Sequence, residues 1–299
     1  MYKQIEVVSE LLKSTHNDVC IDYERLKEWR EMSTLSNVGN LVVDWYTLQE
    51  RLNTRMKSNI SFYDFLENFE SRFLPKVGVS HLYNLRANQS HIKRAKYAYN
   101  LYCGNPTVFR PIIVLNLLDY LPCSVACLDP CMGWGGRLVG CAVFGIPHYI
   151  GIDSNTNLCN PYSQLSGFLE SRSNTKITTL FMNALMVDYS KLKYDLVITS
   201  YPYYNTERYS NYKQYKSKKQ MNEEFYKPLT LHIFENMMPN GYMALNVSPE
   251  IYEYIKSFMG DADMIHPLLA RNRNPTYRES IYIWRKRETN VSPNTHLQQ

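Results

Sequence analysis

The chain has 299 residues, of which 44% are hydrophobic, and it carries a formal net charge of +5. This length allows one large α/β domain with a smaller appendage, and the composition supplies ample material for a packed core. No apolar run approaches the roughly 20 residues that cross a bilayer, and the first six residues lack the apolar core of a secretory signal, so we expect a soluble, intracellular protein of the cytoplasm or of a host cell, with no membrane partner.

Residues 1–85 are expected to be helical, and they lack a catalytic pattern. The clearest helix is predicted at residues 61–73, because Ser61 can cap it and its apolar side chains recur at helical spacing. Those side chains are Phe62, Phe65, Leu66, Phe69 and Phe73. We interpret this stripe as core or as interdomain contact. The segment 75–80 breaks the pattern and leads towards the next domain. Further helices are expected at residues 19–32 and 41–56.

From about residue 91 the pattern changes to helices that alternate with short apolar strands. Strands are expected at 124–128, 149–152, 195–199, 242–247 and 279–284, with helices at 112–121 and 138–144. Strands separated by helices favour a parallel, doubly wound α/β sheet. We therefore predict a small helical N-terminal region at 1–85 that binds the target or a partner, a sheet domain at 86–287, and a disordered polar tail at 288–299.

The segment after the first predicted strand has the features of a cofactor-binding turn. Asp129 follows the strand directly, and Gly133, Gly135 and Gly136 come next. Ligands of open α/β sheets bind beyond the carboxyl ends of the strands, where glycines allow the backbone to come close. Asp153 ends the following strand, and a carboxylate there suits the two hydroxyl groups of a ribose, because it only accepts hydrogen bonds. Alternatively, Asp129 caps the next helix and the glycines serve only a tight turn.

The nine residues from Asp129 to Arg137 read D-P-C-M-G-W-G-G-R. They resemble the cofactor motif of the S-adenosylmethionine-dependent methyltransferases, in the version found in nucleic-acid amino-methyltransferases, including those of bacteriophages. The resemblance implies a Rossmann-like class I methyltransferase fold with a terminal antiparallel strand, and S-adenosyl-L-methionine as the cofactor. It also implies that Asp129, Pro130, the glycine turn and Arg137 hold the methionine part of the cofactor, and that Asp153 holds its ribose.

The same resemblance implies further cofactor contacts. Asn183 stands where the family commonly has an Asp beside the adenine, and its side chain keeps a carbonyl and an amide for hydrogen bonding. The segment Val108-Phe109-Arg110-Pro111 precedes an apolar helix and resembles a family segment that also touches the cofactor. Phe109 and Arg110 are therefore expected in the cofactor site.

The most informative stretch is an apolar strand that leads directly into the turn Ser200-Tyr201-Pro202-Tyr203. An exocyclic base amine is a poor nucleophile because its lone pair is delocalised into the ring. The Ser200 hydroxyl and the main-chain carbonyl of Tyr201 are two acceptors that can bind its N–H groups and favour a tetrahedral nitrogen. Pro202 stiffens the turn, and Tyr203 offers a face on which an extruded base can stack. An ordinary loop is the alternative interpretation.

This turn resembles the family motif D/N/S-P-P-Y/F/W, from which it departs at Tyr201, where the first Pro is usual. The chemistry requires only the backbone carbonyl at that position, so we expect activity to survive. A serine at position 200 resembles many cytosine-N4 enzymes, but adenine-N6 enzymes also use variants of the motif. The methylated base is therefore open between cytosine and adenine, with a slight preference for cytosine.

Cationic side chains follow the turn in a polar insertion that also contains tyrosines. These cations are Arg208, Lys213, Lys216, Lys218 and Lys219, and a second basic cluster contains Arg271 and Arg273. Cations for phosphates and rings for bases suit a target-binding loop, although a solvated lysine loop explains the first cluster equally well. The seven cysteines include no C-x-x-C pair, so we expect reduced thiols and no metal site.

Together the two motifs predict an S-adenosylmethionine-dependent methyltransferase that acts on DNA, at cytosine N4 or adenine N6. RNA or a protein amide is the nearest alternative substrate for the same chemistry. A non-catalytic relative that binds nucleic acid or a partner enzyme is the alternative from another class. Restriction–modification, regulation and marking of a viral genome are all open as biological roles, and the oligomeric state is undecided.

Overall fold

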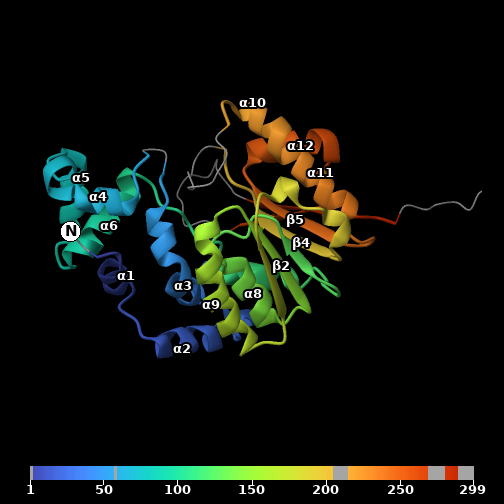
Figure 1. Ribbon diagram of the computed structural model, residues 1–299, viewed down its shortest axis with the longest axis horizontal. Coiled ribbons are helices and arrows are strands. Elements are labelled where there is room, and N and C mark those ends of the chain that lie inside the picture. The colour runs from blue at the N-terminus through green and yellow to red at the C-terminus, as the bar shows by residue number, and fades with distance from the viewer. Residues whose placement is uncertain (1–2, 57–58, 205–214, 269–279, 289–299) are drawn as a thin grey trace, which may run out of the picture.

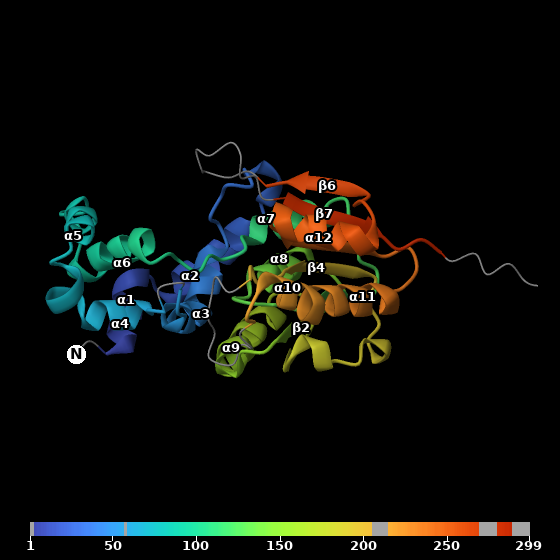
Figure 2. The same cartoon turned by 90° about the horizontal axis from the view of Figure 1, so that it is seen from above.

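The computed structural model describes residues 3–56, 59–204, 215–268 and 280–288 (Figure 1). A sheet covered by helices occupies one part of the long axis, and a cluster of short helices lies at the other end (Figures 1 and 2). Helix α3 (Asn40–Asn53) lies between these two parts. No helix among the described residues is both long and apolar enough to cross a membrane.

The sheet of the described residues has seven strands in the order β3-β2-β1-β4-β5-β7-β6. They are β1 (Cys127–Asp129), β2 (His148–Asp153), β3 (Lys176–Phe181), β4 (Leu196–Ser200), β5 (Tyr242–Val247), β6 (Met264–Pro267) and β7 (Ser280–Arg285). β1 to β5 pair in parallel, while β7 is antiparallel to both of its neighbours. The predicted Rossmann-like fold, with a mostly parallel, doubly wound sheet and a last strand that is antiparallel, is thereby confirmed.

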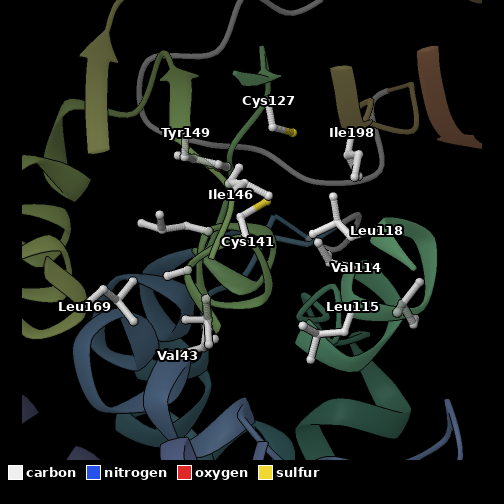
Figure 3. Packing of buried hydrophobic residues seen from close by; sticks show 14 of the residues in the cluster. Val43, Val114, Leu115, Leu118, Cys127, Cys141, Ile146, Tyr149, Leu169 and Ile198 are labelled. Atoms are coloured by element: carbon white, nitrogen blue, oxygen red, sulfur yellow. The ribbon is translucent and has the colours of Figure 1, made fainter. Parts of the chain in front are cut away.

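The side chains of the strands alternate between two apolar cores, one on each face of the sheet. The first core receives Cys127, Tyr149 and Ile198, and it also contains α7 (Pro111–Leu118), α8 (Gly136–Phe144), α9 (Cys159–Glu170) and α2 (His16–Leu26). Figure 3 shows part of this packing. The second core is closed by α10 (Lys218–Met221), α11 (Lys227–Asn236) and α12 (Pro249–Met259). Both faces of the sheet are therefore covered, and only its strand ends are available for a site.

The third apolar core belongs to the N-terminal helical cluster. It is built from α1 (Gln4–Leu12), the second half of α3, α4 (Phe62–Glu67), a five-residue π-helical turn at Phe69–Phe73, α5 (Val77–Asn84) and α6 (His91–Tyr102). Ser61 accepts a hydrogen bond from the Asp64 amide and caps α4, and the predicted phenylalanine stripe is buried in this core. The stripe is thus confirmed as core.

Two sequence predictions about this region need correction. The helix expected at 19–32 begins earlier, at His16, where Thr15 caps it, and it ends at Leu26. The break expected at 75–80 is wrong from residue 77 onward, because α5 begins there. The helical core also draws on residues from both sides of position 86, so the division into domains at that position stays a prediction.

The contact between α7 and α8 depends on a glycine. A Cβ at Gly140 would lie 2.6 Å from the Val114 Cβ and 2.8 Å from the Pro111 carbonyl oxygen, whereas a Cβ at Gly167 would meet nothing within 4 Å. We expect Gly140→Ala to lower the free energy of unfolding by about 1–3 kcal/mol through overpacking. The matched helical control, Gly167→Ala, should raise it by up to about 1 kcal/mol. Urea denaturation of both variants checks this; equal effects would contradict the packing argument.

Candidate active site

Five strand ends meet at one edge of the sheet. Because β1, β2, β3, β4 and β5 are parallel, the residues that follow or end them lie along the same edge. These residues are Asp129, Asp153, Asn183, Ser200 and Asn246. The first four are predicted site residues, and Asn246 was not predicted. The cofactor turn and the Ser200 turn are neighbours because β1 pairs directly with β4.

Asp129 is the polar centre of this edge. Its side chain is 0% exposed and accepts three hydrogen bonds, from Arg137 Nε (2.7 Å), the Tyr149 hydroxyl (2.8 Å) and the Thr199 hydroxyl (2.8 Å). Arg137 also donates to the Cys131 carbonyl. Burial alone would lower the pKa of Arg137, but the Asp129 charge outweighs it and raises the pKa above its ordinary value. These two predicted cofactor residues therefore hold each other, and they join β1, α8, β2 and β4.

The glycine turn is held from several directions. Gly133 and Gly135 have φ of +55° and +93°, which favour glycine. The Tyr162 hydroxyl bonds the Met132 and Gly133 carbonyls at 3.1 and 3.0 Å. A Cβ at Gly136 would lie 1.9 Å from the Phe109 carbonyl oxygen, so the chain at Phe109 lies directly against the turn. By contrast, a Cβ at Gly133 would meet nothing closer than 3.8 Å. The turn is thus packed on one side and uncovered at Gly133.

Asp153 links the tip of β2 to this turn. Its carboxylate accepts from the Gly133 amide and from the Asn155 amide, each at 2.9 Å. Burial raises the pKa of Asp153 to about 6, although the two amide hydrogen bonds oppose that shift. The adjoining loop is fixed from α3, where Glu50 Oε1 accepts from the side-chain amides of Asn155 and Asn157 at 3.1 Å each. The sequence offers no signal for Glu50, which lies about a hundred residues before this loop.

The other predicted cofactor residues occupy different surroundings. Pro130 is buried behind the turn, and the Phe109 ring centroid lies 5.2 Å from the Arg137 guanidinium carbon. Asn183 is exposed at the end of β3, where its side-chain oxygen accepts from the Leu185 amide at 3.0 Å. Arg110 donates to the Thr34 carbonyl at 2.7 Å, in the segment between α2 and α3. Phe109 therefore lies against the glycine turn, and Arg110 ties that segment to the N-terminal helices.

Ser200 and Tyr203 meet at Asn246, which is 5% exposed at the end of β5. The hydroxyls of Ser200 and Tyr203 both donate to Asn246 Oδ1, at 3.1 and 3.2 Å. Asn246 Nδ2 donates to the Ser280 carbonyl at 3.3 Å. A carbonyl can only accept, so this bond fixes the amide with its oxygen towards Ser200. The Ser200 hydroxyl proton is therefore engaged, and its oxygen keeps lone pairs for a donor at the sheet edge.

Tyr201, the departure from the family motif, points its side chain away from this edge. The side chain is 1% exposed, its hydroxyl lies 3.2 Å from the Thr230 hydroxyl, and its ring stacks on that of Tyr226. The Tyr226 hydroxyl in turn donates to the Pro202 carbonyl at 2.6 Å and accepts from the Tyr204 amide at 3.0 Å. Buried tyrosines thus hold the turn in place through its main chain. Only the main chain of Tyr201 lies at the edge of the sheet, because its side chain is buried.

The predicted nucleic-acid residues are only partly described. Lys216, Lys218 and Lys219 are exposed, and Lys218 pairs with Glu250 at 2.6 Å while lying 4.8 Å from the Tyr204 ring centroid. Lys218 is thus partly neutralised, and Lys216 and Lys219 are exposed neighbours of it in the chain. The other predicted contacts, Arg208, Lys213, Arg271 and Arg273, lie outside the described residues.

The described chain contains potential metal ligands and cysteine thiols. The described parts of the chain contain no group of three or more His, Cys, Asp or Glu side chains that could hold a metal ion. All seven cysteines are free thiols. Burial raises the pKa of Cys127 and of Cys131, the two cysteines beside the turn, so neither is an activated nucleophile.

No protein-family model matches the chain, and no curated protein matches its sequence. Among solved structures it is similar to a Listeria monocytogenes protein assigned to the class I S-adenosylmethionine-dependent methyltransferases, with 17% identity, a TM-score of 0.44, and coverage of 97% of this chain and 91% of that one. An rRNA methylase from Streptococcus thermophilus is 12% identical, with a TM-score of 0.38 and coverage of 61% and 100%. A Streptococcus mutans protein described as a methyltransferase, solved with SAH, is 13% identical, with a TM-score of 0.41 and coverage of 60% and 99%. Likeness at this level does not identify a substrate.

The Asp129–Arg137 pair can be tested by its effect on stability. Asp129→Asn leaves the Arg137 charge buried without its counter-ion, so we expect a loss of about 3–5 kcal/mol in the free energy of unfolding. Tyr149→Phe removes only one neutral donor from the same carboxylate and should cost about 0.5–1.5 kcal/mol. Chemical denaturation of both variants makes the comparison. A loss for Asp129→Asn no larger than that for Tyr149→Phe would contradict the ion-pair role.

Proposed function

We propose that this chain is an S-adenosylmethionine-dependent methyltransferase that acts on an exocyclic amine of a DNA base, cytosine N4 or adenine N6. The observation that carries the proposal is the hydrogen bond in which the Ser200 hydroxyl donates its proton to Asn246. The hydroxyl oxygen can then only accept a further hydrogen bond. It lies at the end of β4, whose neighbour β1 leads into the glycine turn. An amine nitrogen with two N–H groups is the complement of such an acceptor. The Thr199 bond to Asp129 supports the two turns acting as one site.

The residues present fit the cofactor. The backbone at Gly133 is uncovered, which suits the close approach of the methionine part. Asp153 is a desolvated carboxylate at the next strand tip, so it gains from the hydroxyl donors of a ribose. Asn183 lies at the end of β3, where the adenine would follow the ribose along the edge. Asp129 and Arg137 act indirectly, because they hold the turn in place. When bound, S-adenosylmethionine supplies a methyl group already activated on a sulfonium.

The target half of the site works by orientation. Ser200 Oγ and the Tyr201 carbonyl would accept the two N–H groups of the amine and direct its lone pair towards the cofactor side of the edge. Tyr226 holds the turn rigid through Pro202 and Tyr204, so these acceptors need little reorganisation. Tyr203 offers its ring to an extruded base while its hydroxyl is held by Asn246.

The decisive experiment incubates purified protein with S-adenosylmethionine labelled in the methyl group and with separate pools of DNA, RNA and protein. Labelled nucleic acid is then digested to nucleosides. We expect label in DNA as N4-methylcytosine or N6-methyladenine, which names the base. Label only in RNA or protein would keep the chemistry and overturn the substrate. No label, with cofactor binding demonstrated by calorimetry, would overturn catalysis.

Two variants serve as controls for that assay. Ser200→Ala should lower kcat by about 10²-fold, the order of effect for one hydrogen bond lost at a reacting centre, with cofactor affinity unchanged. Tyr203→Phe keeps the stacking ring and loses one hydroxyl bond, so its kcat should fall by at most about tenfold. Equal losses of turnover and of cofactor affinity in Ser200→Ala would remove that residue from the target half.

Asp153 makes cofactor binding depend on pH. Its pKa of about 6 lies above the ordinary value because burial disfavours the charged form. Ribose hydroxyls donate to the ionised form, so affinity should be constant above about pH 6 and should fall by about tenfold per unit below it. Calorimetric titration with S-adenosylhomocysteine between pH 5 and 7 measures this. Asp153→Asn should bind more weakly and without the pH dependence; a dependence that persists in this variant would contradict the assignment.

A further inference from the structure

Residues 71–118 contain no Asp or Glu, although the whole chain has 28 acidic residues in 299, about one in eleven. The same stretch contains seven cations and two histidines. The cations are Arg72, Lys76, Arg86, Lys93, Arg94, Lys96 and Arg110. Within the segment no carboxylate offsets these cations, although Glu10 and Asp44 from other segments act on Lys93 and Lys96. It forms α5, α6 and the chain that leads to the glycine turn.

Helix α6 buries one face, and its other face is half-buried or exposed. Ile92, Ala95, Ala98 and Tyr99 enter the helical core. Lys93, Tyr97 and Leu101 recur at intervals of four, so they share a second stripe, and Leu101 is 58% exposed. Arg86, which lies between α5 and α6, adjoins that stripe through the Tyr97 ring, and Arg94 lies three residues before Tyr97 on α6. We call the surface of Arg86, Lys93, Arg94, Tyr97 and Leu101 the α6 outer face.

The rings and cations of this face are already arranged in pairs. The Arg86 guanidinium carbon lies 4.5 Å from the Tyr97 ring centroid, and that of Arg94 lies 3.7 Å from the Tyr83 centroid. Arg94 is further fixed by the Tyr83 carbonyl and the Asn84 side chain, at 3.2 Å each. The nearby carboxylate of Glu10 accepts from Ser90, pairs with Lys13 and also acts electrostatically on Lys93. Ordered cations beside rings suit phosphates with bases stacked next to them.

The α6 outer face is also close enough to the candidate site to share a substrate with it. Six residues lie between Tyr102, the end of α6, and Phe109, whose carbonyl lies against Gly136. A chain of that length spans at most about 25 Å. A nucleic-acid strand rising about 3.4 Å per nucleotide covers that distance in about seven nucleotides. Nucleic acid at the glycine turn could therefore extend to the C-terminal end of α6 within about seven nucleotides.

We propose that the α6 outer face binds the phosphodiester backbone and a flanking base of the nucleic acid whose target base enters the site at Ser200. The inference rests on the proposed function for the identity of that nucleic acid, but not for the existence of the surface. Lys93 and Arg86 contact phosphates, and Tyr97 with Leu101 offers an apolar platform to a base.

The test compares two double variants that remove the same charge. Arg86→Gln with Lys93→Gln alters the α6 outer face, whereas Lys191→Gln with Lys193→Gln alters exposed lysines just before β4, at the opposite edge of the sheet. Fluorescence anisotropy with labelled 20-nucleotide DNA, as duplex and single strand, and with RNA of the same sequence gives the affinity between 50 and 300 mM salt. Tyr97→Ala is measured in parallel to test the ring.

We expect the α6 double variant to bind about five- to tenfold more weakly at 100 mM salt and to lose about 1–2 from the slope of log Kd against log salt, while the control stays within about twofold of the parent. Tyr97→Ala should weaken single-strand binding about fivefold or more without changing that slope. Equal affinities for the two double variants would overturn the proposal, as would a parent protein that binds no nucleic acid. The nucleic acid, DNA or RNA, whose affinity falls more in the α6 double variant is the one that this face binds.

Fluorescence anisotropy measures binding without methyl transfer. It can therefore refute the α6 outer face as a binding surface independently of the proposed function. A parent protein that binds nucleic acid through this face but transfers no methyl group refutes the proposed function and leaves the surface in place. A parent that methylates DNA, with the same KM in both double variants, refutes the surface alone. S-adenosylhomocysteine affinity, measured in all variants, should stay unchanged and verifies that the fold is intact.

Discussion

The buried carboxylate of Asp129 is the constraint on which the candidate site depends. It accepts from side chains of α8, β2 and β4 at once, so the start of the helix after the turn and two neighbouring strands are tied to one point. The Arg137 charge can be buried only because this partner is ionised and close. Thr199 directly precedes Ser200, so the same carboxylate also sets the spacing between the glycine turn and the target turn. The two halves of the site form one polar unit.

Helix α3 extends that unit to the N-terminal region. Its first half packs in the sheet core through Val43, and its second half packs in the helical core through Leu52. Between them, the Thr47 hydroxyl donates to the Trp134 carbonyl of the glycine turn at 3.2 Å, and Glu50 holds the loop after β2. The glycine turn and the loop after β2 are thus supported by a helix that also belongs to the cluster carrying the α6 outer face. Nucleic acid bound there would contact a structure continuous with the cofactor turn.

The sequence predicted the central strands and both turns because each combines an apolar run with glycine, proline or a terminal polar residue. The strands it missed, β3 and β6, are the two edges of the sheet. Edge strands are exposed on one side and need no continuous apolar run, and both lack fully buried side chains. The partners of Asp129 and the support from Glu50 depend on contacts across long separations, which no local pattern encodes. Asn246 had a signal, a polar residue near the tip of an apolar strand.

The antiparallel direction of β7 explains how the Ser200 hydroxyl proton is oriented. In this pairing the start of β7 lies beside the end of β5, so the Ser280 carbonyl reaches the edge where the parallel strands terminate. A parallel neighbour would place its last residue there, and not its first. Because the Ser280 carbonyl can only accept, it orients the Asn246 amide, and that amide orients the hydroxyl protons of Ser200 and Tyr203. The orientation of the Ser200 hydroxyl therefore depends on β7, which runs antiparallel to its neighbours among the described strands.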